Sequence, residues 1–153
     1  MGTFQIGVNR IGIRVRGSMT EVRVAVLGAS GWMGKVHTMA FRTFPHFMGT
    51  EGGTARVVAV VPGRSASVDE MTTRAPGARI LDDWRKAVTD PEVDLVDICL
   101  PDNLHYPVAK AALMAGKHVY CEKQLAETAA EHAVPDPEIT RFGADIARRL
   151  DKD

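Results

Sequence analysis

Gly28, Gly31 and Gly34 are spaced as in a turn that can hold the phosphate groups of a nucleotide. A short apolar run over residues 22–27 precedes them, and apolar residues at helical spacing follow. In such a unit Gly28 lets the chain turn sharply, Gly31 leaves backbone N–H groups open to a pyrophosphate, and Gly34 lets the helix pack closely. The N-terminus of that helix adds partial positive charge. The GxxGxxG spacing is one residue longer than GxGxxG, and the alternative is a tight turn without a ligand.

Three further residues of the same turn are candidate cofactor contacts: Ser30, Trp32 and Met33. The choice between NAD and NADP depends on the end of the next strand, where an acidic residue commonly accepts hydrogen bonds from the ribose of NAD. Here an apolar run over 56–61 is followed by Pro-Gly-Arg-Ser, without a carboxylate. Arg64 and Ser65 can donate hydrogen bonds to a 2′-phosphate. They favour NADP, with NAD still possible, and the alternative for Arg64 is a solvated loop charge.

The apolar pattern predicts the elements that position these residues. Short apolar runs, typical of buried parallel strands, alternate with segments of helical periodicity. The predicted strands lie at residues 22–27, 56–61, 79–81, 93–100 and 118–121. Met33, Val36, Ala40 and Phe44 fall at helical spacing, so a first helix should follow the glycines and end at Pro45. Further helices are expected over 67–74, after a cap at Asp82 or Asp83, and over 108–115.

This alternation predicts an α/β protein with a doubly wound parallel sheet, the Rossmann fold, in three layers α/β/α. Ligands of such sheets bind at the carboxyl ends of the strands. Four segments should meet at that edge: residues 28–34, 62–65, 100–105 and 122–123. Pro101 and Asn103, in the turn after the fourth strand, are therefore candidate cofactor contacts as well.

Three segments of the second half carry a family pattern: DPEVDLVDICLP at 90–101, NLH at 103–105 and AGKHVYCEK at 115–123. With the glycine turn, residues 28–37, they resemble the cofactor-binding half of the Gfo/Idh/MocA family of oxidoreductases, over roughly residues 21–131. The resemblance implies a domain that binds NAD(P). It also implies an enzyme that oxidises or reduces sugars, polyols or related small carbonyl compounds.

The family's signature is Glu-Lys-Pro, whose lysine lies near the nicotinamide and the reacting substrate. The resemblance implies a catalytic role for Lys123, cofactor contacts for Glu122 and Lys123, and a catalytic or cofactor-binding role for His105. His37 also matches a family position near the cofactor. Lys123 could donate a hydrogen bond that polarises a carbonyl, and the alternative is an exposed lysine paired with Glu122 or solvent. The third position is Gln124, and glutamine disfavours the cis bond that commonly precedes the family's proline.

The composition is that of an ordinary globular protein, with 45% apolar and 25% charged residues among 153. Basic and acidic residues number 19 each, so nothing electrostatic points to nucleic acid or an anionic membrane. No apolar run approaches the length of a membrane span. Cys99 and Cys121 have neither a disulfide pattern nor metal-ligand spacing, so we expect no metal and a cytoplasmic location.

The expected organisation has three parts: an N-terminal extension over 1–20, disordered or an edge strand, a dinucleotide-binding domain over 21–134 and a helical tail over 135–153. Family enzymes have a second domain that supplies most of the substrate pocket, and we expect no full substrate domain here. A homo-oligomer or a partner chain would then cover the open site. Two function classes remain: the NAD(P)-binding part of an oxidoreductase, or a non-catalytic NADP-binding module such as a sensor or degenerate remnant.

Overall fold

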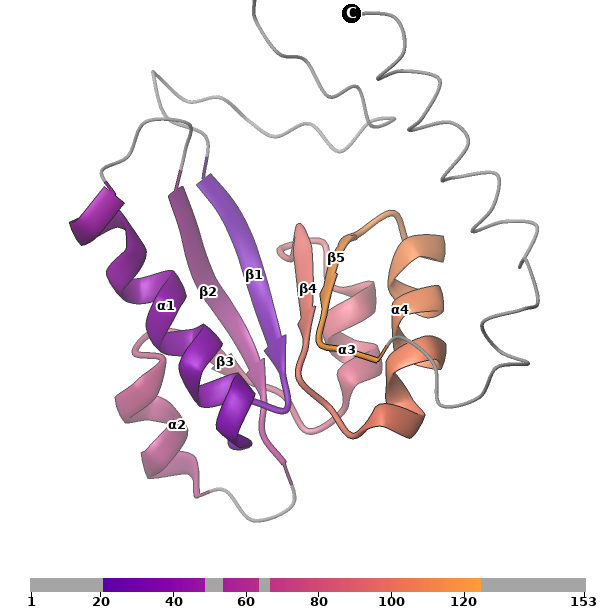
Figure 1. Ribbon diagram of the computed structural model, residues 1–153, viewed down its shortest axis with the longest axis horizontal. Coiled ribbons are helices and arrows are strands. Elements are labelled where there is room, and N and C mark those ends of the chain that lie inside the picture. Colours follow the sequence, from indigo (N-terminus) through magenta and orange to yellow (C-terminus); the bar gives the residue numbers. More distant parts are fainter. Residues whose placement is uncertain (1–20, 49–53, 64–66, 125–153) are drawn as a thin grey trace, which may run out of the picture.

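The structure is a computed structural model that describes residues 21–48, 54–63 and 67–124 (Figure 1). The predicted extension over 1–20 and tail over 135–153, together with Arg64 and Ser65, lie outside the described residues. The strands are β1 (Glu21–Leu27), β2 (Thr54–Val61), β3 (Arg79–Ile80), β4 (Leu95–Ile98) and β5 (His118–Cys121). The helices are α1 (Trp32–Met48), α2 (Val68–Arg74), α3 (Trp84–Thr89) and α4 (His105–Met114), with a short 3-10 helix, η1 (Asp102–Leu104).

The five strands are parallel and lie in the order β3-β2-β1-β4-β5 (Figure 1). From the central β1 the chain runs outward to β3, and it then crosses to the other side of β1 for β4 and β5. This reversal defines a doubly wound sheet, so the predicted Rossmann fold is confirmed. The switch point lies between β1 and β4, where Leu27 pairs with Ile98.

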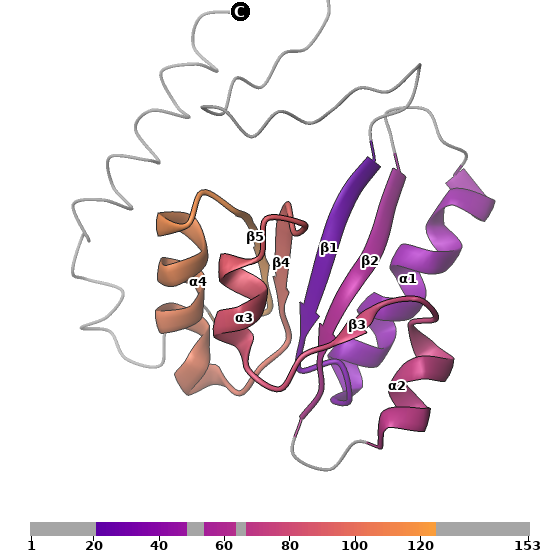
Figure 2. The ribbon, with the colours of Figure 1, turned by 180° about the vertical axis from the view of Figure 1, so that it is seen from behind.

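Helices cover both faces of the sheet and give the three predicted layers (Figure 2). One core, on the side of α3 and α4, includes Val96, Ile98 and Val108. The other core, on the side of α1 and α2, includes Val26 and Met71. Residues 24–27 of β1 are completely buried, because the central strand is covered on both faces.

The starts of two helices follow from their capping residues. The Asp83 carboxylate accepts a hydrogen bond from the Arg85 N–H at 2.9 Å, so α3 begins at the predicted cap. The Ser67 hydroxyl accepts one from the Glu70 N–H at 3.1 Å and starts α2. Each cap satisfies a backbone donor that has no partner within its helix.

The first helix differs from its prediction in two ways. It continues through Pro45 to Met48, so the predicted end is wrong; a proline this near the end removes one of the last intrahelical hydrogen bonds. The apolar residues at helical spacing are not uniformly buried either, since Val36 is 37% exposed and Ala40 is exposed, while Gly34 and Thr38 are buried. The inward face is set by Gly34, where the glycine turn leaves no room for a side chain.

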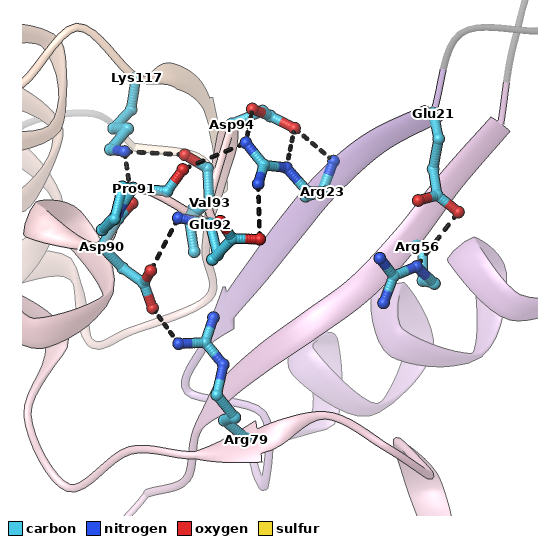
Figure 3. Close-up of polar contacts among 10 residues, drawn as sticks. All are labelled: Glu21, Arg23, Arg56, Arg79, Asp90, Pro91, Glu92, Val93, Asp94 and Lys117. Carbon is cyan, nitrogen blue, oxygen red and sulfur yellow. Dashed lines mark hydrogen bonds and ion pairs between the residues drawn. The ribbon is translucent and has the colours of Figure 1, made fainter. Parts of the chain in front are cut away.

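Charged residues tie the amino ends of the strands together (Figure 3). Arg23 of β1 donates to both carboxylate oxygens of Asp94, just before β4, at 2.7 and 2.9 Å. Lys117, just before β5, donates to the main-chain carbonyl of Asp90 at 2.6 Å, and Arg79 of β3 pairs with the Asp90 carboxylate. We call these five residues the amino-edge network. None of the helices in the described ranges has both the length and the apolar character needed to cross a membrane.

Candidate cofactor site

The glycine turn connects β1 to α1 at the carboxyl edge of the sheet. The N–H groups of Gly28 and Ala29 donate to the Val61 carbonyl at 2.8 and 3.1 Å, which holds the turn against the end of β2. Gly28 has a φ of 80°, and a Cβ there would overlap the backbone of Cys99. A Cβ at Gly34 would overlap the Gly28 carbonyl. The fold therefore requires Gly28 and Gly34 to be glycine.

Gly31 differs, because the protein itself leaves more room beside it. It is exposed, and the nearest atom to an added Cβ would be the Gly28 carbonyl oxygen at 3.2 Å. Helix α1 begins at the next residue, and the first N–H groups of a helix have no partner within it. The turn thus forms an open cradle of backbone donors at the positive end of α1. These residues fit the pyrophosphate of a dinucleotide.

Ser30 connects the glycine turn to the loop after β2. Its hydroxyl oxygen accepts a hydrogen bond from the Gly63 N–H at 2.7 Å, and a Cβ at Gly63 would lie 2.6 Å from that oxygen. The loop that carries Arg64 and Ser65 therefore leaves β2 beside the phosphate turn. The described residues after β2, Pro62 and Gly63, supply no carboxylate.

The first turn of α1 presents apolar surface next to the cradle. Trp32 is 79% exposed, and Met33 is half-buried. Val36 and Met39, on the following two turns, are exposed as well. The predicted contacts Trp32 and Met33 therefore stand where a ligand at the glycine turn would meet them, on the border of an exposed apolar face.

A cluster of polar residues around His37 lies at the same edge. The Nδ1 atom of His37, from α1, lies 3.0 and 3.1 Å from the two carboxylate oxygens of Asp97 in β4. Its Nε2 atom lies 3.1 Å from Oε1 of Glu122, just after β5. The Cys99 sulfur lies 3.3 Å from Nδ1, and the Tyr120 ring packs against the imidazole with 5.4 Å between centroids. This His37 cluster (His37, Asp97, Cys99 and Glu122) joins α1, the end of β4 and the segment after β5.

Burial sets the ionisation of the cluster. Asp97 is completely buried, and burial raises the pKa of its carboxyl, although the hydrogen bond with His37 acts in the opposite direction. Burial and the Asp97 charge raise the pKa of the Cys99 thiol far above its usual range, and burial raises the pKa of Cys121 to about 11. Both thiols are therefore protonated at neutral pH and are not nucleophiles.

A second histidine holds the turn after β4. His105, the first residue of α4, is 1% exposed. Its Nε2 atom lies 2.7 Å from the Leu100 carbonyl oxygen, and its Nδ1 atom lies 2.6 Å from the Gln124 carbonyl oxygen. His105 thus bridges the end of β4 and the segment after β5. Its predicted site role stays a prediction, and this geometry favours a positioning role.

Lys123 lies between two anchored residues. The Glu122 N–H donates to the Ile98 carbonyl at 3.0 Å, and the Glu122 side chain contacts His37. Gln124 is held through its carbonyl oxygen. Lys123 itself is exposed. The Lys123–Gln124 peptide bond is cis, contrary to the expectation for a residue other than proline.

The predicted residues that the structure describes all follow the carboxyl ends of strands: Gly28, Ser30, Gly31, Trp32, Met33, Gly34, Pro101, Asn103, His105, Glu122 and Lys123. Pro101 and Asn103 are exposed there. Sequence reasoning missed Asp97. Its signal was an acid in the middle of a predicted apolar strand, where a charge is stable only with a partner.

Comparisons with known proteins agree with the Rossmann fold and with the binding of a dinucleotide cofactor. The Gfo/Idh/MocA family model, described as an oxidoreductase family with an NAD-binding Rossmann fold, matches residues 22–133. Levoglucosan dehydrogenase of Pseudarthrobacter phenanthrenivorans is 33% identical over 136 residues, 86% of this chain and 35% of the relative. D-glucoside 3-dehydrogenase of Escherichia coli is 31% identical over 140 residues, 90% and 35% of the two chains. A structure of levoglucosan dehydrogenase in complex with NADH and levoglucosan matches with a TM-score of 0.70 at 30% identity, over 79% of this chain and 32% of the other.

The fold and the glycine turn define a dinucleotide-binding Rossmann domain of the oxidoreductase class. The chain belongs to the Gfo/Idh/MocA family of oxidoreductases. It spans about a third of the length of the curated relatives it matches.

Proposed function

We propose that the chain is the NAD(P)-binding domain of an oxidoreductase that acts on sugars, polyols or related small carbonyl compounds. The observation that carries the proposal is the contrast within the glycine turn. Gly28 and Gly34 are required for folding, whereas Gly31 is exposed, directly before the first N–H groups of α1. The substrate class is supported by two relatives whose names are levoglucosan dehydrogenase and D-glucoside 3-dehydrogenase.

The cofactor would lie along the carboxyl edge. Backbone N–H groups after Gly31 would bind the pyrophosphate, and Pro101, Asn103 and Glu122 would line the nicotinamide end. A bound nicotinamide supplies hydride transfer, which side chains cannot perform. Lys123 would donate a hydrogen bond to the substrate oxygen and polarise its bond to carbon.

The cofactor that we propose is NADP in preference to NAD, since no carboxylate follows β2 and Arg64 and Ser65 come next. Calorimetry with NADPH and NADH on the wild type and on Arg64→Ala tests this. The variant should lose about 1–3 kcal/mol of NADPH binding and little of NADH binding. Equal affinity for both cofactors in the wild type would refute the preference.

A non-catalytic NADP-binding module is the second candidate, and Gln124 in place of the signature's proline favours it. We expect this chain by itself to bind cofactor with little or no turnover, because hydride transfer needs a substrate carbon held against the nicotinamide with water excluded. The test follows NADPH absorbance with a panel of aldoses and polyols. Robust turnover that is lost in Lys123→Ala would establish catalysis and reject the module.

The exposed apolar face of α1, with Trp32, Val36 and Met39, supports a cover for the open site. We propose a second copy of the chain or a partner chain as that cover, in a cytoplasmic protein. Sedimentation of the wild type and of Met39→Glu tests whether a second copy of the chain covers this face.

A further inference from the structure

In the proposed function Lys123 polarises the substrate. Its backbone, however, lies just beyond the end of β5, outside the sheet. The last sheet-type hydrogen bond is the one from the Glu122 N–H to the Ile98 carbonyl at 3.0 Å. A long side chain on an unanchored segment would sample many positions, and a misplacement of about 1 Å can lower a rate by about a hundredfold. The edge therefore needs other contacts that fix the segment from Glu122 to Gln124.

The first contact comes from His37. Its Nε2 atom lies 3.1 Å from the Glu122 carboxylate, and its Nδ1 atom lies within 3.1 Å of both oxygens of Asp97. Carboxylates only accept hydrogen bonds, so both ring nitrogens donate when the imidazole is doubly protonated. The His37 side chain is 11% exposed and Asp97 is not exposed at all, so these charge-assisted bonds are shielded from water.

A bound metal ion is the other arrangement that such residues allow. The candidate ligand atoms of His37, Asp97 and Cys99 lie within 4.8 Å of one another. The Nδ1 atom, however, lies at direct hydrogen-bond distance from both carboxylate oxygens of Asp97, which is the geometry of a proton donor and its acceptor. A proton on Nδ1 of His37 therefore accounts for the contact with Asp97 without a metal ion.

The second contact comes from His105, which engages Gln124, the residue after Lys123. It engages the carbonyl oxygens of Gln124 and Leu100 at 2.6 and 2.7 Å, and carbonyl oxygens also only accept. The residues before and after Lys123 are thus each tied to a histidine, and each histidine is tied in turn to the end of β4.

We propose that His37, oriented by Asp97, and His105 are positioning residues that clamp Glu122 and Gln124 and so fix Lys123 at the nicotinamide end of the site. The inference rests on the proposed function for the role of Lys123, but the clamp itself is a property of the chain. The contacts that we assign to the two histidines are with Asp97, Glu122, Leu100 and Gln124. Their effect is on the geometry of the segment between them.

The test compares His37→Gln with His118→Gln. His118 serves as the control, because it lies at the amino end of β5, on the edge of the sheet opposite to the candidate site. Amide hydrogen exchange is measured for residues 122–124 and for the glycine turn. Calorimetry then compares NADPH with ADP-ribose 2′-phosphate, which lacks the nicotinamide. The ratio of the two affinities reports on the nicotinamide end alone.

In His37→Gln we expect exchange at residues 122–124 to rise by about tenfold or more, the loss of about 1.4 kcal/mol of local stability, with the glycine turn unchanged. The affinity ratio should fall by a similar factor, and His118→Gln should change neither readout. If His37→Gln does not fold, Glu122→Ala removes the same contact from its more exposed side and should give the same local increase.

Unchanged exchange at residues 122–124 in folded His37→Gln would overturn the clamp. So would an equal loss of affinity for both ligands, which would indicate general damage to the domain. Absence of NADPH binding by the wild type is a different result, because it would refute the proposed function while the exchange data still judge the clamp.

Discussion

The two edges of the sheet use charge in opposite ways. At the amino edge, Arg23 and Lys117 are themselves partly open to water and donate to buried acceptors, and the acid Asp94 is matched by a cation (Figure 3). At the carboxyl edge, Asp97 is completely buried and is matched by a histidine. The first arrangement joins strand ends together. The second connects the glycine helix to the segment that carries the candidate lysine.

The pKa shifts of the two acids have opposite directions. Burial acts to raise the pKa of Asp94, but hydrogen bonds and charge from Arg23 outweigh it and lower the pKa. Burial raises the pKa of Asp97, and His37 offsets that only in part. At neutral pH the ionised Asp94 therefore adds to the stability of the fold, whereas the ionised Asp97 subtracts from it. A buried acid with a raised pKa is a candidate functional residue.

The largest expected effect is at the carboxyl edge. Gly31→Val should abolish NADPH binding while the domain stays folded, because a branched side chain on this exposed residue would stand in front of the N–H groups that we propose bind the pyrophosphate. Calorimetry and a thermal melt measure the two properties. Gly34→Ala is the matched comparison, and it should lose stability because its Cβ overlaps the Gly28 carbonyl. Unchanged binding in folded Gly31→Val would mean that the turn is only structural.

A substitution at the amino edge should lower stability and leave the affinity for NADPH nearly unchanged. Asp94→Asn should lower the free energy of unfolding by about 1–3 kcal/mol, since it removes the charged acceptor of two hydrogen bonds from the Arg23 guanidinium. Affinity for NADPH should stay within about twofold, a difference below 0.5 kcal/mol. Urea denaturation and calorimetry are the measurements. A large loss of affinity without a loss of stability would contradict the division between the edges.

Asp94 and Asp97 should contribute to the pH dependence of stability in opposite directions. The Asp94 pKa is lowered on folding, so its contribution is present above the unfolded value of about 3.9 and is lost as pH falls through the folded pKa. The Asp97 pKa is raised, so its contribution is present below about 3.9 and is lost as pH rises through the folded pKa. Asp94→Asn should flatten the acid side of the stability profile.

The smallest expected effect is that of Asp97→Asn on stability at pH 7. Because the ionised carboxylate is disfavoured where it is buried, we expect a change within about 1 kcal/mol, in either direction. Urea denaturation at pH 4 and pH 7 should show that the variant has lost the decline of the wild type over this interval. A loss as large as that of Asp94→Asn would mean that Asp97 is mainly a stabilising residue.

Much of the fold could be predicted from the sequence because its local signals agree. The buried half of β1, residues 24–27, is an uninterrupted apolar run, the glycine turn follows it directly, and Asp83 caps α3 where the pattern places a cap. The burial of α1 could not be predicted in this way. Its inward face is chosen by the absence of a side chain at Gly34, which a count of apolar residues does not detect.

The position of a candidate site residue was predictable where it depends only on the neighbouring sequence. The edge position of Lys123 follows from the strand before it. The partners of His37 did not follow, because Asp97 and Glu122 lie 60 and 85 residues away and meet it only through the strand order. For Asp97 the sequence carried a signal, an acid inside an apolar strand, but not the identity of its partner.

The most direct test of the division between the edges is a titration of the isotope-labelled chain with NADPH, followed by amide chemical shifts. The account predicts the largest shifts at Gly31, Trp32 and Met33, with further shifts at Glu122 and Lys123, and none at the amino-edge network. Shifts centred on Arg23 and Asp94, or no shifts at saturating NADPH, would contradict it.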